Sequence, residues 1–378
     1  MLVNSYAQNV IIYKIVQTCN LNCTYCYVYN KGDDSWKSRP KQASFEVTKK
    51  LCSRIVEHYY RHNLKQLYLE IHGGEPLLLG VEKFRKHIEI IMSECSQLNL
   101  DIFVQTNGLL LNDEWLKLFY DFNIPFSISI DGPSIANDKN RVYRNGKGSF
   151  DELFSILNRL QKNKIFDSLC HGYLCVIDPE SEGDYIFNWF YDNNFKKVDL
   201  LLPDLNHTEI DNISIEKTSR FLIKAFDRWL EIGKEAPSVR FFEYAIRSKT
   251  GLKPNLDALG GDLSAISVIE SDGSIGCHDV MRINGGIYNR DFMNISKYPL
   301  GVHVDFFNIK KIQKPCAKCL NCKHFTSCGG GYLPHRYDGI DFNNPSYYCN
   351  TLYSFFEHVE KRLLEMVPKK MWSKINTA

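Results

Sequence analysis

Short apolar runs alternate with longer amphipathic segments through the first two-thirds of the chain. The apolar runs predict strands at residues 10–17, 66–72, 101–105, 124–130, 169–177 and 197–202. The segments between them predict helices at residues 45–62, 81–97, 112–121, 149–163 and 180–193. Strands that alternate with helices are typical of parallel βαβ units. The pattern therefore predicts an α/β fold in which six units form an incomplete (β/α)6 barrel.

The pattern changes in the last third of the chain. More helix is predicted over 214–248, and the apolar run at 265–270 leads into Ser271-Asp272-Gly273-Ser274, a hairpin signal. A final helix is predicted over 350–366, ending before Pro368. The stretch at 250–264 is rich in Gly, Pro and Asn and predicts a domain boundary. We expect a barrel domain with bridging helices over 1–250, and a smaller domain with a terminal helix over 251–378.

Composition excludes several classes of protein. The formal net charge of +2 gives no reason to expect nucleic acid or an anionic membrane as a partner. No apolar run reaches the roughly 18 residues of a membrane span, and no signal peptide is recognisable. Thirteen cysteines without a secretion signal indicate reduced thiols and metal binding in a cytoplasmic protein. About nine residues precede the first predicted strand, so we expect no separate leader-recognition domain at the N-terminus.

Three cysteines follow the first predicted strand directly. Cys19, Cys23 and Cys26 form a CxxxCxxC loop in QTCNLNCTYCYVYN. Thiolates favour iron–sulfur clusters or zinc, and a closed zinc site normally has four protein ligands. Three thiolates can hold three irons of a four-iron cluster and leave the fourth iron open to a small molecule. The alternative is a chance spacing among thirteen cysteines.

With Tyr25 before its last cysteine, this loop resembles the signature of the radical S-adenosylmethionine (SAM) superfamily. The resemblance implies a [4Fe–4S] cluster whose open iron binds the amino and carboxylate groups of SAM. It also implies reductive cleavage of SAM to a 5′-deoxyadenosyl radical, which removes a hydrogen atom from the substrate. The partial barrel is the fold that this resemblance implies as well.

Polar signatures end the next three predicted strands: His72-Gly73-Gly74-Glu75-Pro76, Gln105-Thr106-Asn107-Gly108 and Ser129-Ile130-Asp131-Gly132-Pro133. Ligand-binding residues of parallel barrels collect at the carboxyl ends of strands, whereas each signature alone could be an ordinary turn. The GGEP motif resembles the SAM-amino motif of the superfamily, and Arg141 is a candidate clamp for the SAM carboxylate, in competition with Arg144. The residues expected to contact SAM are Tyr25, Gly73, Gly74, Glu75, Gln105, Thr106, Asn107, Ser129, Asp131 and Arg141.

A second cysteine group lies near the C-terminus. Cys319, Cys322, Cys328 and Cys349 could bind zinc or a [4Fe–4S] cluster. Their spacing resembles the SPASM extension of radical SAM peptide-modifying enzymes, which implies an auxiliary [4Fe–4S] cluster. One cysteine of the full SPASM pattern is replaced by Tyr332, and only Cys277 and Cys316 remain as possible further ligands. We therefore expect one complete auxiliary cluster, and buried thiols without metal at Cys52, Cys95, Cys170 and Cys175.

The block GGGYLPHRYDGIDFNNPSYYCNTL resembles the terminal block of cyclophane-forming radical SAM/SPASM maturases. The resemblance implies that the chain joins an aromatic ring to a β-carbon in a ribosomally made precursor peptide, with a flavodoxin or ferredoxin as electron donor. Asp279 and Asp131 are candidate proton acceptors. His335 and Arg336 could contact peptide or be structural. Formylglycine formation on a sulfatase, thioether formation and epimerisation remain alternatives, and a non-catalytic zinc protein is the alternative of another class.

Overall fold

The computed structural model describes residues 5–209, 212–250, 252, 256–285 and 293–368. Contacts divide the chain into two compact units, each assembled from separate stretches of sequence. The first unit comprises Met1–Ser129, Asn137–His171 and Leu263–Lys311. The second unit comprises Ile130–Ala136, Gly172–Asp262 and Ile312–Ala378.

The first unit is built on a mainly parallel sheet. Its strands are β1 (Val10–Val16), β2 (Leu67–Gly73), β3 (Leu100–Thr106), β4 (Phe126–Ser129), β8 (Ile266–Ile269) and β9 (Ile275–Gly276), in the order β4-β3-β2-β1-β8-β9. All neighbours in this series pair in parallel except β8 and β9, which are antiparallel. Six of the seven residues of β1 are buried, as expected for a strand covered on both faces.

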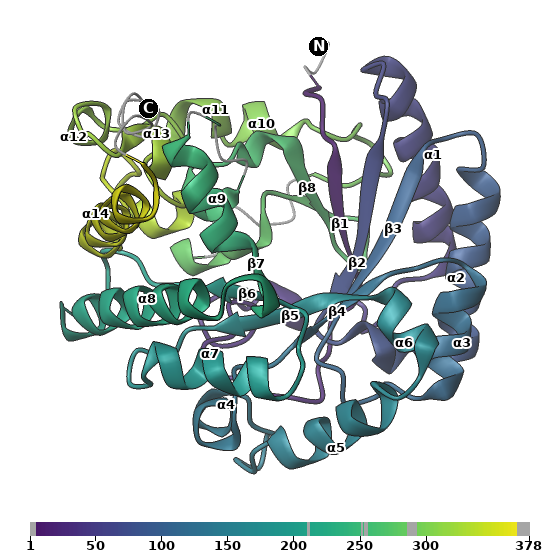
Figure 1. The fold of residues 1–378 in the computed structure, drawn as a ribbon. Helices are drawn as coiled ribbons and strands as arrows, with labels where there is room; N and C mark the ends of the chain where they lie inside the picture. Colours follow the sequence, from purple (N-terminus) through teal and green to yellow (C-terminus); the bar gives the residue numbers. More distant parts are fainter. Residues whose placement is uncertain (1–4, 210–211, 251, 253–255, 286–292, 369–378) are drawn as a thin grey trace. The chain divides into compact units, whose positions relative to one another are not determined.

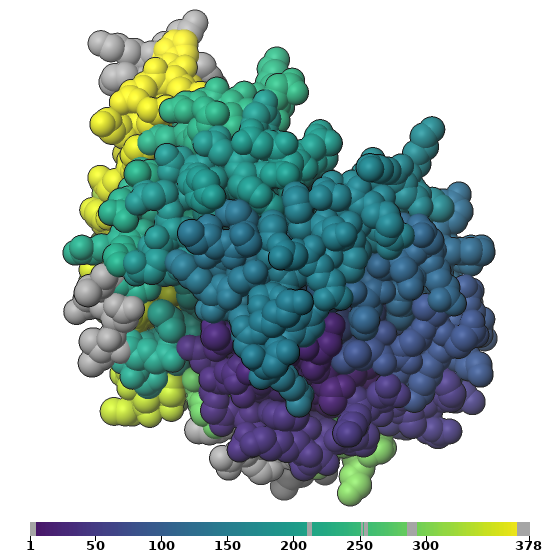
Figure 2. Space-filling model, turned by 90° about the horizontal axis from the view of Figure 1, so that it is seen from below, coloured from purple at the N-terminus to yellow at the C-terminus, as the bar shows by residue number. Residues whose placement is uncertain are grey.

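Three amphipathic helices cover one face of this sheet. They are α1 (Phe45–Arg61), α2 (Val81–Glu94) and α3 (Asp113–Asp121), which lie side by side along β1, β2 and β3 (Figure 1). The side chains of Ser44 and Asn112 cap the N-termini of α1 and α3 by accepting a backbone hydrogen bond. On the face seen in Figure 2, the purple N-terminal residues and the blue residues that follow them form one continuous surface.

The second unit contains the later strands and most of the long helices. Strand β5 (Cys170–Val176), which enters this unit at Gly172, pairs in parallel with β6 (Lys197–Leu201), and β6 pairs in parallel with β7 (Ser238–Val239). The main helices are α7 (Gly183–Asp192), α8 (Asn212–Ile232), α9 (Arg240–Lys249) and α14 (Cys349–Met366). Helix α14 packs on α8 and α9, and Phe226, Phe242 and Phe355 form its aromatic contacts.

The structure confirms the predicted α/β fold, with each of the six expected strands followed by at least one helix. It also confirms the hairpin of β8 and β9 and a final helix that begins at Cys349. Several short helices were not predicted separately, among them α4 (Ser134–Asn140) and α6 (Lys164–Leu169). Helix α5 (Phe150–Leu160) ends earlier than expected, and Asn163 then caps α6. Helices of fewer than two turns leave no clear periodic signal in a sequence.

Pairing of β8 with β1 was not expected from the sequence. Val10 to Tyr13 pair in register with Ile266 to Ile269, so residues 263–311 belong to the same unit as β1. Residue 251 lies outside the described residues, and the division into 1–250 and 251–378 stays a prediction. In the described part of the chain, no helix has the length and hydrophobicity needed to cross a membrane.

Candidate active site and candidate metal centre

The loop with the first three cysteines leaves β1 and is fixed to the chain around residue 141. The backbone N–H groups of Asn22 and Thr24 donate to the carbonyls of Val142 (2.7 Å) and Asn140 (3.0 Å). Cys19, Cys23 and Cys26 are all partly exposed residues. The hydrogen bonds to Val142 and Asn140 therefore fix the loop that carries the three thiols.

Gly73 and Gly74 allow the end of β2 to lie directly against this loop. A Cβ on Gly73 would lie 2.2 Å from the carbonyl oxygen of Val16, and one on Gly74 would lie 2.3 Å from that of Thr18. The φ of Gly73 is also +155°, which other residues rarely adopt. The two glycines are thus required because backbone packs directly on backbone here. The sequence analysis had expected them to contact SAM and did not predict this packing role.

Glu75 joins the ends of β2 and β3. Its Oε1 accepts from the Thr106 hydroxyl at 2.7 Å and from the Leu77 backbone at 3.0 Å, and its Oε2 accepts from the Asn107 backbone at 2.8 Å. The side chain is 1% exposed, and burial raises its pKa although the three hydrogen bonds and Arg141 oppose that shift. Glu75 therefore positions Thr106 and Asn107, at the end of β3, relative to the end of β2.

Asn107 and Arg141 connect the ends of the strands to the cysteine loop. Asn107 Nδ2 donates to Asn20 Oδ1 at 2.7 Å and lies 3.7 Å from Cys19 Sγ. Arg141 Nη1 donates to the Tyr25 hydroxyl at 3.0 Å. Burial raises the pKa of Cys26, and the charge of Arg141 opposes that shift. A buried guanidinium beside the loop suits the predicted pairing with a carboxylate.

The remaining predicted SAM contacts divide between the two units. Gln105 Nε2 donates to Ser129 Oγ at 2.9 Å, which joins the ends of β3 and β4 within the first unit. Asp131 belongs to the second unit, where its Oδ1 accepts from the Val176 backbone at 3.0 Å. The SAM-contacting role of each of these residues stays a prediction.

Asp279 lies in a buried network of charged and aromatic groups within the first unit. Its Oδ2 accepts from the Tyr27 hydroxyl at 2.5 Å and lies 2.9 Å from the Lys14 ammonium, and its Oδ1 lies 3.4 Å from His278 Nδ1. Burial alone would raise the pKa of Asp279, but Lys14 and the neighbouring histidines hold it far below its usual value. Asp279 is therefore ionised at any physiological pH.

Lys14 is a site residue that the sequence interpretation missed. It is 1% exposed, and its ammonium lies 5.2 Å from the centre of the Tyr27 ring. The available signal was a single lysine inside the apolar run Val10–Val16, which is unusual because a buried lysine needs a partner of opposite charge. That partner, Asp279, is 265 residues away in the sequence and became apparent only in the fold.

The second cysteine group surrounds one cavity in the second unit. The cavity has a volume of about 270 Å³, and all four predicted ligands line it: Cys319, Cys322, Cys328 and Cys349. Gly329, Gly330 and Gly331 have φ values of +60°, +90° and +73°, and this turn carries the chain away after Cys328. The fold thus brings together thiols that are up to 30 residues apart in the sequence.

The thiols of both groups are electrostatically suited to a bound cation. Burial raises the pKa of Cys19 and of Cys328 to about 12, and the neighbouring Glu75 raises that of Cys19 further. A metal centre stabilises such thiolates, so binding would release their protons. In the described chain, no three cysteine sulfurs lie within 4.8 Å of one another.

The two additional candidate ligands lie in different units. Cys277 is a buried thiol of the first unit, and burial raises its pKa well above the usual value. Cys316 is in the second unit but does not line the cavity. Tyr332, at the position of the missing cysteine, is buried with its ring 5.0 Å from that of His335. An aromatic side chain therefore packs where the full pattern has a thiolate.

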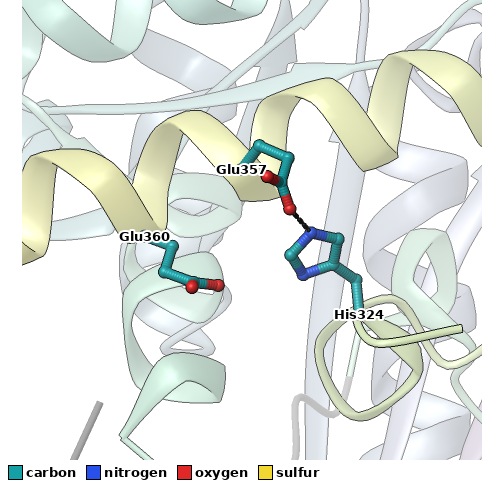
Figure 3. Close-up of side chains that lie close together, drawn as sticks. All are labelled: His324, Glu357 and Glu360. Atoms are coloured by element: carbon teal, nitrogen blue, oxygen red, sulfur yellow. Dashed lines mark hydrogen bonds and ion pairs between the residues drawn. The ribbon is translucent and has the colours of Figure 1, made fainter. Parts of the chain in front are cut away.

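A group of possible metal ligands borders the cavity, but these residues already pair with the ammonium group of a lysine. His324 lines the cavity, and it is hydrogen-bonded to Glu357 on α14, one turn before Glu360 (Figure 3). The ligand atoms of these three residues lie within 4.8 Å of one another. Lys249 Nζ, however, lies 2.8 Å from His324 Nδ1 and 3.1 Å from Glu360 Oε2. We therefore assign the group to charge pairing that supports the cavity wall.

Arg336 and His335 from the GGGYLPHR block are structural in this fold. The Arg336 guanidinium is 2% exposed and donates to the carbonyls of Gln313, Lys314, Phe342 and Asn344. His335 Nε2 lies 3.2 Å from Asp204 Oδ1. Both side chains are thus occupied by contacts within the second unit.

Comparisons with known proteins show which superfamily the chain is similar to. Residues 13–186 match the family model of the radical SAM superfamily. A cysteine-type anaerobic sulfatase-maturating enzyme from Clostridium novyi (strain NT) is 26% identical over 363 residues, covering 90% of this chain and 91% of the relative. The radical SAM cyclopropyl synthase TigE from Paramaledivibacter caminithermalis is 24% identical over 346 residues, covering 85% and 68%.

A solved structure has the same fold over nearly the whole length of the chain. The structure of anSMEcpe with bound AdoMet and the Cp18Cys peptide superimposes with a TM-score of 0.80 at 24% sequence identity. The match covers 94% of this chain and 98% of that chain.

Proposed function

Because the chain is a radical SAM enzyme, which uses a [4Fe–4S] cluster and SAM, we propose that it crosslinks a peptide substrate by joining an aromatic ring to a β-carbon. The broader reaction class, oxidative modification of a peptide or protein, is the one suggested by the names of its relatives. The observation that carries the proposal is the connected cluster of polar residues in the first unit, where Glu75 bonds to Asn107 and Asn107 reaches Cys19. This cluster adjoins the loop that carries the three cysteines.

The cysteines of the loop, Arg141 and Glu75 each have a proposed role. Cys19, Cys23 and Cys26 would hold the cluster, and Arg141 would pair with the carboxylate of SAM. When bound, the cluster and SAM supply the radical that removes a hydrogen atom from the substrate. Glu75 keeps the ends of β2 and β3 together, so that the pocket keeps its shape around the ligand.

Crosslinking removes two hydrogens from the peptide. One leaves the β-carbon as a hydrogen atom, and the other leaves the ring as a proton and an electron. Asp279 is the stronger candidate for the proton, because it is a permanent carboxylate in the same unit as the cysteine loop. A weak base suffices, since the oxidised ring adduct is a strong acid. Cys319, Cys322, Cys328 and Cys349 would hold an auxiliary [4Fe–4S] cluster, which can accept one electron.

Formation of formylglycine on a sulfatase is the second candidate. It is favoured by the anaerobic sulfatase-maturating enzyme, a relative that matches over 90% of the chain. The feature that favours crosslinking is Tyr332, a buried aromatic residue in place of one cysteine of the full pattern. TigE, whose name denotes cyclopropyl formation, is a relative that also favours a new carbon–carbon bond.

Incubation with peptides under anaerobic conditions tests the proposal. One peptide carries an aromatic residue two places from an aliphatic residue, and a second carries a sulfatase-type cysteine or serine. We expect the first peptide to lose two hydrogens and to acquire a ring-to-β-carbon bond, observed by tandem mass spectrometry and NMR. Formylglycine in the second peptide, with the first unchanged, would support the second candidate. The Cys23→Ala variant is the control, because it lacks one proposed cluster ligand.

The metal content tests the alternative of another class. A structural zinc protein would contain stoichiometric zinc and would be colourless in air. The proposed enzyme is brown after anaerobic reconstitution and contains about eight irons per chain if both sites hold four-iron clusters. A flavodoxin or ferredoxin donor and a cytoplasmic location remain predictions.

A further inference from the structure

A fifth thiol lies directly behind one of the four cysteines of the auxiliary site. Cys316 Sγ is 3.6 Å from Cys319 Sγ, and the two residues are 5% and 7% exposed. Cys319 lines the cavity, whereas Cys316 does not. The site therefore has four thiols that line the cavity and a fifth, Cys316, that does not line it but contacts Cys319.

We propose that Cys316 and Cys319 form a reversible dithiol pair, which closes to a disulfide when the auxiliary site holds no metal and thereby removes Cys319 from the ligand set. The proposal rests on the proposed function only in treating Cys319 as a metal ligand. It assigns to Cys316 a role in oxidation of the empty site and none in holding the cluster.

The backbone already places the two sulfurs for this bond. The pair is separated by Ala317 and Lys318, and Cys319 lies in the short helix α12 (Ala317–Leu320) that begins after Cys316. The sulfurs are in van der Waals contact, and a disulfide requires them to approach to about 2.05 Å. Rotation of the two side chains can achieve this within a CxxC segment, the spacing used by dithiol oxidoreductases.

The cavity provides the route for an oxidant, which we identify as a low-molecular-weight disulfide. The sulfur of Cys319 attacks this disulfide and loses its proton, giving a mixed disulfide and releasing one small thiol. Cys316 then attacks the Cys319 sulfur, loses its own proton and releases the second small thiol. The two cysteine sulfurs are oxidised by two electrons in total, and the small disulfide is reduced to two thiols.

Arg336 keeps this segment in place. Its guanidinium binds the carbonyls of Gln313 and Lys314, just before Cys316. None of the ion pairs in the described residues involves Arg336, so its buried charge has no carboxylate partner there.

Metal binding and the disulfide are mutually exclusive, since both use the sulfur of Cys319. A bound cluster therefore protects the pair, and oxidation of the empty site prevents loading until a reductant reopens it. A second pair of neighbouring thiols, Cys52 and Cys95, provides an internal comparison because neither residue lines this cavity. The same oxidant should leave that buried pair reduced.

The test uses the full-length apoprotein, prepared anaerobically with a chelator and treated with glutathione disulfide. We expect alkylation and peptide mapping to identify a Cys316–Cys319 disulfide, with a mass loss of two hydrogens. Iron loading of the oxidised protein should fall by about half, from about eight to about four irons per chain, and dithiothreitol should restore it. Cys316→Ser should form no internal disulfide, retain glutathione on Cys319 and load normally when reduced. Cys95→Ser is the matched control and should behave as wild type.

Two results would overturn the inference: absence of the Cys316–Cys319 disulfide in the treated apoprotein, or loss of iron from reduced Cys316→Ser as large as that from Cys319→Ser. The second result would make Cys316 a ligand. Failure of the proposed auxiliary cluster gives a different result, because reduced wild-type protein would then load only about four irons while the disulfide could still form. Thermal unfolding of both serine variants verifies that they are folded.

Discussion

Glu75 and Asn107 join two neighbouring strand ends, with Glu75 Oε2 accepting from the Asn107 backbone N–H at 2.8 Å. The same carboxylate accepts from Thr106 and Leu77, so one buried side chain satisfies three donors. Asn107 in turn reaches Asn20 in the cysteine loop. The position of the loop is therefore coupled to the carboxylate of Glu75.

We expect Glu75→Gln to loosen this pocket, because an amide cannot accept from donors on both of its ends. The substitution should lower the free energy of unfolding by about 1–3 kcal/mol. It should also weaken SAM binding at least tenfold, measured by isothermal titration calorimetry. Glu89→Gln, on the exposed face of α2, is the control and should change neither quantity. Unchanged SAM affinity in Glu75→Gln would contradict the positioning role.

Lys14 and Asp279 form a buried ion pair at 2.9 Å. Asp279→Asn leaves the ammonium of Lys14 uncompensated, at a cost of about 3–5 kcal/mol in the free energy of unfolding. Lys14→Met combined with Asp279→Asn should recover much of that loss. Denaturant unfolding of the two single variants and the double variant measures the coupling energy, and strictly additive effects would count against the pair.

The two cysteine groups should load iron independently. We expect Cys349→Ala to retain about four irons and SAM cleavage, but to lose crosslinking of the peptide. Cys23→Ala should lose SAM cleavage altogether. Cys170→Ala, which lies outside both groups, serves as the control and should load about eight irons. A wild-type content of about twelve irons would indicate a second auxiliary cluster that uses Cys277.

Acid should destabilise the first unit through its buried histidines, of which His58 and His303 are two examples. Burial and the neighbouring His62 lower the pKa of His58 to about 4, and burial lowers that of His303 to about 4. In the unfolded chain, a histidine has a pKa of about 6.5. Between about pH 4 and about pH 6.5, the unfolded chain therefore binds more protons than the folded protein, and falling pH favours unfolding. The stability from each neutral histidine is complete above pH of about 6.5 and is lost as the pH falls toward about 4.

Each of these histidines can account for about 3 kcal/mol over this range. His58 accepts from the Gln8 backbone at 2.9 Å, and the His58→Gln variant retains an acceptor without titrating. Urea unfolding at a series of pH values should show a smaller loss of stability in this variant than in wild type. Equal losses in the two proteins would refute the assignment to His58.

Arg336 should be among the more sensitive positions of the second unit. Arg336→Met removes the donors to four carbonyls, and we expect the free energy of unfolding to fall by about 3–5 kcal/mol. Arg336→Lys should recover only part of this loss of stability, because an ammonium group cannot reproduce the planar array of donors of a guanidinium. Arg220→Met, at a largely exposed ion pair on α8, should cost less than about 1 kcal/mol. Calorimetric unfolding of the three variants provides the comparison.

Local sequence patterns were sufficient for most of the fold and for the identity of the thiols. The predicted strands and long helices follow from periodicity, which depends on neighbours a few residues apart. The spacing of Cys19, Cys23 and Cys26 and the GGEP motif are local patterns too. They could therefore be compared with the radical SAM signature from the sequence alone. The short helices α4 and α6 carried no such signal.

Contacts between distant residues were decided only by the tertiary structure. Pairing of β8 with β1 places Asp279 beside Lys14, and no local pattern encodes a pairing over that separation. The fold likewise shows that Gly73 and Gly74 pack on the chain itself, that Glu75 is committed to β3, and that Cys316 lies outside the cavity. The sequence by itself determined which groups are available for radical chemistry. The tertiary structure determined which of them meet, because burial and long-range packing set the partner and the charge of each.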